Sequence, residues 1–320
     1  MLQALQIKFQ KTNILMAQFS QLTQSIIWML GAMISFTLMA VSGRELFSSL
    51  DTFEIMLYRS LVGIVLVLSF GKYFNTLNQI RVKNLSLHFV RNISHFGGQN
   101  FWFYAIALIP FSQLFAFEFS TPLFIVFLAP IFLGELLTKE KLFASGIGFI
   151  GIILVARPDL NTISWALIAA FLLPICFAAT AIATKLLTRE FSLTCILFWL
   201  VIMQTIFSLI CAGYDFSIKI PTKSDMPFLL IVSITGLTAH LCMTKAFSLA
   251  PVSVVMPIDF VRLPLISMVG YLFYNEVLTW YIVLGSVLVF VGNYINVKAE
   301  ERTQSHERVP GSERQYKNSA

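Results

Sequence analysis

The sequence predicts an all-α integral membrane protein with ten transmembrane helices arranged as two inverted five-helix repeats. Three observations lead to this prediction. Of the 320 residues, 57% are hydrophobic and only 12% are charged, about half the charged fraction of a typical soluble domain. The mean hydropathy is +0.80, and apolar runs suited to crossing a bilayer recur along the chain. The second half also repeats features of the first half at a constant spacing.

The predicted spans follow one another with short connections. Most have close to the roughly 20 apolar residues that a helix needs to cross the hydrocarbon, and the fifth is the shortest. The longest connection, 71–86, is too brief to form a separate soluble domain. The spans are 25–43, 53–70, 87–109, 112–133, 142–156, 164–187, 192–212, 228–247, 252–274 and 280–297.

The two ends of the chain are predicted to be polar segments outside the bundle. Lys8 and Lys11 precede the first apolar run much as the basic part of a signal peptide does. This run is long enough to span the membrane and has a counterpart later in the chain, so we expect a retained helix after a cytoplasmic segment, 1–24. Residues 299–320 have almost no apolar content and are predicted to be a disordered cytoplasmic tail.

The distribution of lysine and arginine among the connections predicts the orientation. If the N-terminus lies inside, the outer connections receive only Arg44, Arg157, Lys219 and Lys223. Short cytoplasmic loops are enriched in these residue types, so both termini are predicted to face the cytoplasm across the inner (plasma) membrane. The inner side then receives Lys8, Lys11, Lys72, Arg81, Lys83, Lys139, Lys141, Lys185, Arg189, Lys298, Arg302, Arg308, Arg314 and Lys317.

The cysteines and the distribution of charge limit which functions the sequence can have. Cys176, Cys195, Cys211 and Cys242 lie in apolar runs without a CxxC spacing, so we expect small packing residues instead of disulfides or a metal site. The net charge of +6 is not gathered in a basic stripe with interleaved aromatic residues. It fits loops that face an anionic leaflet. The sequence therefore predicts a lipid bilayer around the helices, and no cofactor, metal or nucleic-acid partner.

An internal repeat relates the two halves at an offset of 141 residues. When residues 105–156 are placed on 246–297, 13 of 52 positions agree without a gap. Matching leucines and isoleucines mean little in apolar segments, but matching prolines, serines, glutamates and glycines raise the agreement above chance. The repeats are predicted to be 25–157 and 158–298. Each holds five helices, an odd number, so the second repeat must enter the membrane from the opposite side.

The same offset places a carboxylate at one point of the fourth helix in each half, Glu118 and Asp259. A charge at membrane depth costs a few kcal/mol unless it faces a partner or a water-filled cavity. Pro257 and Pro264 flank Asp259, and interrupted helices in inverted repeats are a recurring design of alternating-access transporters. Counted at 1.5 Å per residue, each carboxylate lies roughly 9 Å from its own membrane edge. One is predicted to serve an outward subsite and the other an inward one.

The residues that carry a family resemblance lie mainly around the fourth and fifth helices of each half. They are RSLVGIVLVL, YAIALIPFSQLFAFEFSTPLF, GELLTKEKLFASGIGFIGIILVARP and KAFSLAPVSVVMPIDFVRLPLISMVGYLFYNE. Over residues 25–298 the chain resembles the drug/metabolite transporter (DMT) superfamily, specifically proteins built from two EamA-type repeats. The resemblance implies a carrier of a small metabolite such as an amino acid, riboflavin or S-adenosylmethionine, or an exporter of drugs or siderophore-like compounds. It does not name the substrate.

Four charged residues are the first candidates for a cavity that binds substrate or a proton. A carboxylate in such a cavity can alternate between binding a proton and binding a cation, which suits Glu118 and Asp259. Arg262 is placed near the midplane. It either binds a substrate carboxylate or phosphate or neutralises Asp259 as a structural ion pair at i,i+3. Arg59 reaches nearly the depth of Glu118, and we expect these two side chains to pair, chiefly for structure.

Two further pairs of polar residues are related by the same offset. Gln99 and His240 fall on the third and eighth helices, where matched polar side chains suit two walls of one cavity. A packed, hydrogen-bonded histidine is the alternative. Tyr104 and Lys245 are likewise matched, although Lys245 is near enough to the cytoplasmic face to extend toward water. The aromatic run FWFY at 101–104 either stacks on a ring-bearing substrate or contacts lipid.

Two other features are predicted to be structural. Glu135 and Glu276 follow the fourth and ninth helices and are expected to cap the first turn of the next helix. Glycines on the fifth and tenth helices, including Gly285 and Gly292, let helices approach closely. They suit packing within the chain or a homodimer interface.

The predicted function is secondary active transport of a small organic metabolite by alternating access. No G-x-x-x-x-G-K-[ST] phosphate loop occurs, so a proton gradient or exchange would drive uphill movement. A broad-specificity exporter is the alternative. An intramembrane enzyme would need a motif such as HExxH or GxGD, and neither occurs, so no catalytic residues are expected. A channel or lipid translocase would use the same repeats with a continuous or lateral path.

Overall fold

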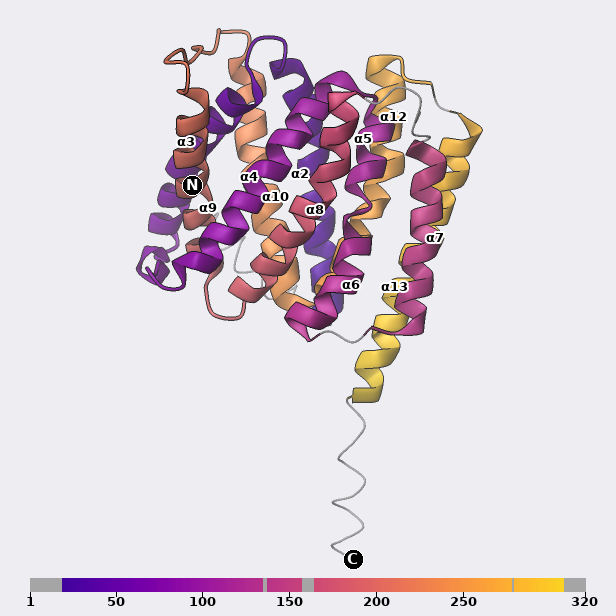
Figure 1. Cartoon of the computed structure of the whole chain (residues 1–320). Helices are drawn as coiled ribbons and strands as arrows, with labels where there is room; N and C mark the ends of the chain where they lie inside the picture. The colour runs from indigo at the N-terminus through magenta and orange to yellow at the C-terminus, as the bar shows by residue number, and fades with distance from the viewer. Residues whose placement is uncertain (1–18, 135–136, 157–163, 278, 308–320) are drawn as a thin grey trace, which may run out of the picture.

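The computed structural model describes residues 19–134, 137–156, 164–277 and 279–307, and the regular secondary structure of this part is helical. The helices form one bundle and run mostly up and down in the view of Figure 1. Each predicted span coincides with one helix or with a pair of short helices. They are α2 (Gln21–Leu46), α3 (Thr52–Tyr73), α4 (Leu85–Leu108), α5 (Phe111–Glu118), α6 (Thr121–Leu133), α7 (Lys139–Ala156), α8 (Trp165–Leu187), α9 (Leu193–Ala212), α10 (Met226–Leu249), α11 (Val252–Ile258), α12 (Arg262–Tyr274) and α13 (Trp280–Glu307), with the 3-10 turns η1 (Leu77–Gln79) and η2 (Asp259–Val261).

Short polar side chains start several of these helices. The hydroxyl of Ser20 accepts a hydrogen bond from a first-turn amide of α2 at 3.1 Å. Asp51 and Glu54 form a capping box at the start of α3, with N···O distances of 2.8 and 2.9 Å. Ser192 caps α9 in the same way as Ser20 caps α2. Such caps satisfy the first amides of a helix, which have no partner within the helix, so these helix starts are specified locally by the sequence.

Two of the predicted spans are broken in the middle, each at its carboxylate. The helix α5 ends at Glu118 and α6 begins at Thr121. The helix α11 ends at Ile258, and Asp259 opens the turn η2 before α12 begins. A break of this kind frees backbone groups, which is tolerated at membrane depth only where protein or a cavity surrounds them. The two breaks therefore mark the interior where a site is most expected.

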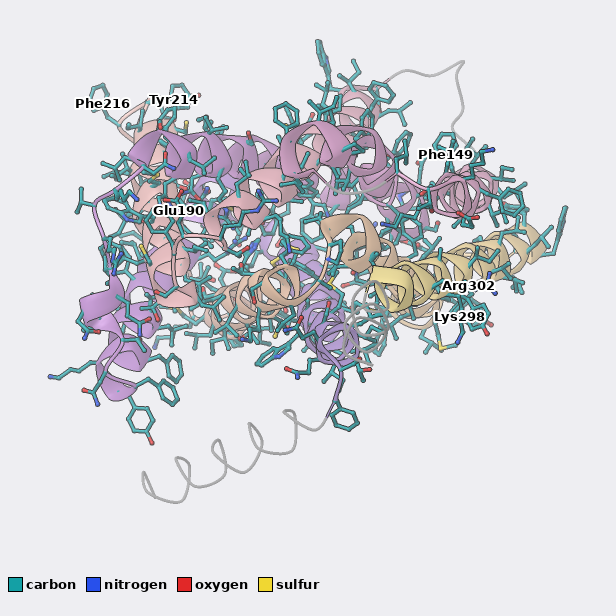
Figure 2. The ribbon with its side chains drawn as sticks, turned by 90° about the horizontal axis from the view of Figure 1, so that it is seen from below. Phe149, Glu190, Tyr214, Phe216, Lys298 and Arg302 are labelled. Atoms are coloured by element: carbon teal, nitrogen blue, oxygen red, sulfur yellow. The ribbon has the colours of Figure 1, made fainter. Side chains whose placement is uncertain are left out.

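Six stretches of the described helices are long and apolar enough to cross a membrane by length and composition. They are α2, α3, α8, α9, α10 and Val254–Tyr274, which runs through η2 and α12. Their outer faces carry aliphatic side chains such as Ile34, Val65 and Ile210, which are 59–67% exposed. Figure 2 shows side chains projecting from the whole periphery of the bundle, with Phe216 at its edge. The chain is a multi-pass membrane protein, and the crossing of all ten spans belongs to the proposal below.

The long helices pack in pairs that join the two halves. The helix α2 lies along α10 and α4 lies along α8, and exchanging the halves converts the first pair into the second. The pairs α3 with α9 and α7 with α13 map onto themselves. A methyl group at Gly292 would lie only 2.7 Å from the carbonyl oxygen of Ala144. This glycine therefore serves packing between α13 and α7, one of the two roles that the sequence leaves open.

Helix ends differ from the predicted spans at both ends of the chain. The helix α2 begins at Gln21, inside the predicted segment 1–24, and α13 continues to Glu307, through the first part of the predicted disordered tail. That part contains alanine, glutamate and arginine, which favour helix, and extending an existing helix needs no new nucleus. Residues 1–18 and 308–320 lie outside the described residues.

Candidate functional site

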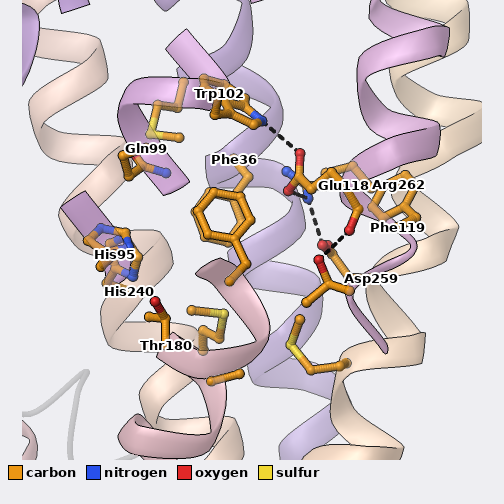
Figure 3. Close-up of a pocket in the computed structure, with 16 residues that line it drawn as sticks. Phe36, His95, Gln99, Trp102, Glu118, Phe119, Thr180, His240, Asp259 and Arg262 are labelled. Carbon is orange, nitrogen blue, oxygen red and sulfur yellow. Dashed lines mark hydrogen bonds and ion pairs between the residues drawn. The ribbon is translucent and has the colours of Figure 1, made fainter. Parts of the chain in front are cut away.

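A cavity lies inside the bundle at the two helix breaks (Figure 3). Its walls combine aromatic rings and methionines with a few polar or charged groups, as in most small-molecule sites. The lining residues are Phe36, Met39, His95, Gln99, Trp102, Glu118, Phe119, Thr121, Phe177, Thr180, Ala181, His240, Met243, Met256, Asp259 and Arg262.

Most of the lining residues are related by the offset of 141 positions. Of the 16, 12 fall into six pairs, so both halves contribute the same positions. The cavity therefore lies where equivalent parts of the two halves meet. The pairs are Phe36 with Phe177, Met39 with Thr180, Gln99 with His240, Trp102 with Met243, Glu118 with Asp259, and Thr121 with Arg262.

Three charged side chains form a cluster on one wall of the cavity. Nη2 of Arg262 donates to Oε1 of Glu118 at 2.5 Å and to Oδ2 of Asp259 at 2.6 Å (Figure 3). The indole Nε1 of Trp102 donates to the other carboxylate oxygen of Glu118 at 2.7 Å. The side chains of Arg262, Asp259 and Glu118 are only 1%, 9% and 12% exposed. The structure thus gathers two carboxylates around one guanidinium in a nearly enclosed place.

The cluster carries one formal negative charge in excess. Two neighbouring carboxylates repel each other unless a cation is shared between them, and Arg262 supplies that cation. Its guanidinium also lies 5.0, 4.9 and 5.2 Å from the ring centroids of Phe36, Phe115 and Phe119, so cation–π attraction helps to fix it. Oδ1 of Asp259 has no hydrogen-bond partner among the described residues. This oxygen is therefore an acceptor that a proton or a cationic ligand would satisfy.

The opposite wall comes from α4 and α10 and carries imidazole and amide groups. The rings of His95 and His240 meet edge to face with their centroids 4.4 Å apart. Both nitrogens of His240 lack a hydrogen-bond partner within the described parts of the chain, although the residue is 2% exposed. Gln99 lies on this wall as well, and its Oε1 accepts from Nη1 of Arg59 at 2.5 Å. This wall therefore holds hydrogen-bonding groups without a carboxylate.

Two predicted arrangements of the charges are wrong. Arg59 does not pair with Glu118, because Gln99 accepts from Arg59 and the carboxylate is bound by Arg262. Glu118 and Asp259 do not form separate outward and inward subsites, because both bind the same guanidinium nitrogen. The predicted depths assumed that both spans are straight helices that begin at the membrane surface. In the structure, α5 ends at Glu118 and Asp259 directly follows α11, and the two carboxylates lie together.

Tyr104 and Lys245 lie away from the cavity that they are predicted to line. Each follows a lining residue by five positions, Tyr104 after Gln99 and Lys245 after His240. Five positions on an α-helix turn a side chain by roughly 140° relative to the first. The two residues are therefore equivalent in the repeat but point to another face of their helices.

Trp102 belongs to the aromatic run 101–104, for which the sequence leaves open stacking on a substrate or contact with lipid, and it is 1% exposed and lines the cavity. Met243, Phe36 and Phe177 are lining residues that the sequence analysis did not name. Trp102 follows Gln99 by three positions and Met243 follows His240 by three, so each shares a helix face with a predicted residue. Helix phase combined with the offset would have placed both on the cavity wall. Phe36 and Phe177 are also related by the offset, but aromatic side chains carry little signal in a chain with 31 phenylalanines.

Glu276 binds groups from the first half, at the end of the bundle where α12 leads to α13. Its Oε1 forms an ion pair with Arg44 at 2.9 Å and accepts from the backbone amide of Phe111 at 3.0 Å. Arg44 donates in addition to the carbonyl of Ile109 at 3.1 Å. The glutamate therefore caps α5, not the next helix in sequence as predicted. Its repeat equivalent, Glu135, lies outside the described residues.

The chemistry of the cavity favours binding over catalysis. Carboxylate oxygens and ring faces both attract a cationic group, and the histidines and Gln99 offer hydrogen bonds to polar parts of a ligand. Within the described residues, no three histidine, cysteine, aspartate or glutamate side chains are placed to hold a metal ion. The arrangement is that of a binding site for a small organic molecule.

Comparison with known proteins gives a consistent result. The model of the EamA-like transporter family matches the chain twice, over residues 23–157 and 164–298. A solved crystal structure superposes with a TM-score of 0.71 at 14% identity, covering 88% of this chain and 99% of its own, which shows a shared fold.

Three relatives of known function are transporters. The chain is 23% identical over 279 residues to an S-adenosylmethionine uptake transporter of Rickettsia bellii, covering 87% of this chain and 94% of the relative. It is 26% identical over 220 residues to a riboflavin transporter of Rhizobium johnstonii, with 68% and 72% covered. It is 22% identical over 261 residues to a pseudopaline exporter of Pseudomonas aeruginosa, with 81% and 91% covered.

The substitution Arg262→Gln is expected to destabilise the folded protein, because two buried carboxylates then lose their shared cation. Removing one partner of a buried ion pair typically costs about 3–5 kcal/mol. Adding Glu118→Gln and Asp259→Asn to the same variant removes the repulsion and is expected to recover most of the loss. Thermal unfolding of the purified protein in detergent, followed by tryptophan fluorescence, measures these differences.

Lys83→Gln is the matched control for this experiment. Lys83 and Glu190 form an ion pair at 3.4 Å whose side chains are 71% and 49% exposed, and exposed pairs stabilise little. The control is therefore expected to unfold at nearly the wild-type temperature. An Arg262→Gln variant as stable as wild type would contradict the view that the three charges depend on one another.

Proposed function

Because the chain belongs to the EamA-like transporter family, we propose that it is a secondary active transporter that moves a small organic metabolite across the inner (plasma) membrane by alternating access. The family matches confirm the resemblance noted in the sequence. The three relatives carry small metabolites, and they support the same class of substrate here. The main cavity lies at the junction of the two halves, where this mechanism places a substrate site.

The proposed substrate is a cationic, ring-bearing metabolite of the S-adenosylmethionine kind. The observation that carries this proposal is the cluster of Glu118, Asp259 and Arg262, whose negative excess faces a cavity lined by aromatic rings. S-adenosylmethionine combines a sulfonium cation with an adenine ring. The Rickettsia uptake transporter aligns over nearly the whole membrane-spanning part of this chain. A neutral flavin would use the rings but leave the charge excess uncompensated.

Repeat-equivalent contacts at the two ends of the bundle support an inverted arrangement of the halves. Arg44 donates to the carbonyl of Ile109 at 3.1 Å. Lys185 and Ala250 stand 141 positions after these residues, and Lys185 donates to the carbonyl of Ala250 at 2.9 Å. The first contact joins the C-terminal ends of α2 and α4, and the second joins the C-terminal ends of α8 and α10. A two-fold axis in the membrane plane would exchange them, and alternating access would open one end while the other stays closed.

Coupling is proposed to involve the same carboxylates. A proton and a cationic substrate are alternative partners for the free Oδ1 of Asp259. Exchange of one for the other, or of one substrate molecule for another, would drive transport without ATP. This agrees with the absence of a phosphate loop from the sequence.

A broad-specificity exporter is the second candidate function. Three methionines, Met39, Met243 and Met256, line the cavity, and flexible thioether side chains adapt to ligands of different shape. The pseudopaline exporter among the relatives shows that export occurs in related proteins. An exporter would accept several unrelated cations in the exchange assay described next, whereas a dedicated carrier would accept one.

The transport proposal is tested by counterflow in proteoliposomes. Vesicles loaded with unlabelled S-adenosylmethionine are expected to accumulate labelled S-adenosylmethionine transiently, because only a carrier with a reorienting site exchanges ligand in this way. Glu118→Gln or Asp259→Asn is expected to lower the exchange rate at least about tenfold, since a charged hydrogen bond contributes about 1.5–3 kcal/mol. Glu190→Gln, on an exposed turn, is expected to exchange at the wild-type rate.

Two results of this assay would contradict parts of the proposal. Absence of counterflow with S-adenosylmethionine, riboflavin and a panel of amino acids would reject secondary transport of these metabolites. Counterflow at the wild-type rate in both carboxylate variants would leave transport standing and remove the two acids from the site.

The proposed orientation has its own test. Both termini are proposed to be cytoplasmic, in keeping with basic residues such as Lys298 and Arg302 at the lower end of α13 (Figure 2). A reporter fused after Ser319 is expected to report the cytoplasm, and one inserted near Lys219 is expected to report the outer side. Both reporters on one side would contradict two inverted five-helix repeats.

A further inference from the structure

Arg59 is a buried cation without an ion-pair partner among the described residues. It is 6% exposed in the middle of α3. Its hydrogen bonds all use Nη1, to Oε1 of Gln99 at 2.5 Å and to the sulfur atoms of Met39 and Met56 at 3.9 and 3.7 Å. A buried charge is costly unless an opposite charge or a functional ligand meets it. The guanidinium therefore has capacity for an anion.

A second, smaller cavity lies against Arg59. It is formed by α3, α9 and α10, and His240 lines both this cavity and the main one. His240 and Gln204 are 2% and 1% exposed, and both ring nitrogens of the first and Oε1 of the second lack a partner within the described residues. The amide oxygen of Gln204 can only accept, whereas a ring nitrogen of His240 can donate to a ligand. The imidazole of His240 is therefore the group that a polar ligand would meet here.

The fold itself does not require an arginine at this position. The repeat equivalent of Arg59 is Leu200, which also lines the second cavity. One half thus builds this wall with a leucine and the other with an arginine. Gly236 leaves room for the guanidinium, because a Cβ there would lie 3.1 Å from Nε and 3.3 Å from Cζ of Arg59. The packing of this wall therefore does not need an arginine, and Arg59 adds a charged group to it.

We propose that Arg59 and His240 form a carboxylate-binding subsite beside the main cavity, so that the transported metabolite is a zwitterion. Its carboxylate would lie at Arg59, and its cationic group would lie at Glu118 and Asp259. The inference rests on the proposed function and narrows its substrate class. A guanidinium matches a carboxylate with two parallel hydrogen bonds, and Gln99 holds this guanidinium from one side. A neutral imidazole donates one further hydrogen bond.

The separation of charges between the two walls supports a zwitterion over other ligands. The cluster around Arg262 has one negative charge in excess, and Arg59 is a cation beside the second cavity without a carboxylate among the described residues. Arg91 on α4 is a second buried cation, but it lines neither cavity. A simple cation would neutralise the cluster but leave the charge of Arg59 uncompensated. A simple anion would neutralise Arg59 but leave the negative excess of the cluster. An uncompensated buried charge is strongly unfavourable. A zwitterion satisfies both walls at once.

The test compares S-adenosylmethionine with its decarboxylated form, which keeps the sulfonium, amine and adenine groups and lacks only the carboxylate. Equilibrium binding of each compound to the purified full-length protein gives a ratio of dissociation constants. Wild type is expected to prefer the carboxylate-bearing compound by about tenfold or more, the effect of a charged hydrogen bond. In Arg59→Gln the ratio is expected to fall to about one, because affinity for the carboxylate-bearing compound alone decreases.

Arg189→Gln is the control. Arg189 follows α8, is exposed, donates to the carbonyl of Leu133 at 2.6 Å and lines neither cavity. Its loss is expected to leave the ratio at the wild-type value. Gly236→Ala provides a second variant if Arg59→Gln does not fold, because it crowds the guanidinium without removing the charge. This variant is also expected to lower the ratio.

The outcomes separate failure of the subsite from failure of the proposed function. A wild-type ratio near one, or an unchanged ratio in Arg59→Gln and Gly236→Ala, overturns the carboxylate subsite while transport of the cation stands. Binding of neither compound to wild type overturns both the proposed substrate class and the subsite.

Discussion

In the middle of the bundle, one nitrogen of Arg262 binds Glu118 from the first half and Asp259 from the second. Helices in lipid gain little from apolar burial against one another, so polar contacts and close packing decide how they associate. Each carboxylate stands where its helix breaks, and the broken backbone needs protein or a cavity around it. The cavity and the rings around the guanidinium lie at this charged contact, and the two halves meet there as well as along the paired long helices.

The two halves supply equivalent positions but different chemistry. Thr121 of the first half corresponds to Arg262 of the second, and Arg59 corresponds to Leu200. A fully symmetric pair of repeats would place equal charges on both walls. These two replacements instead put a negative excess on one wall and an isolated cation near the other. The equivalent positions suit the exchange of halves that we propose for transport, while the substitutions give the cavity its polarity.

Apolar runs and the offset of 141 residues were enough to predict the helices and to match Glu118 with Asp259 and Gln99 with His240. These signals did not predict which side chains would pair. The sequence indicates that Arg59 is buried, but it does not indicate that Gln99 accepts its hydrogen bond. Depth counting assumed straight helices and therefore separated two carboxylates that share a cation. The prediction that Tyr104 lines the cavity was wrong for a different reason. Repeat equivalence does not take into account which face of its helix a residue occupies. Trp102 could have been assigned to the cavity from the helix face that it shares with Gln99.

In the proposed function, substrate binds where repeat-equivalent residues meet, between the carboxylate cluster and the wall of α4 and α10. An experimental structure of the protein with bound S-adenosylmethionine tests this most directly. We expect the sulfonium to lie against Glu118 and Asp259, with side chains of both halves around the ligand. A ligand bound at the periphery, or within one half alone and away from Arg262, would contradict it.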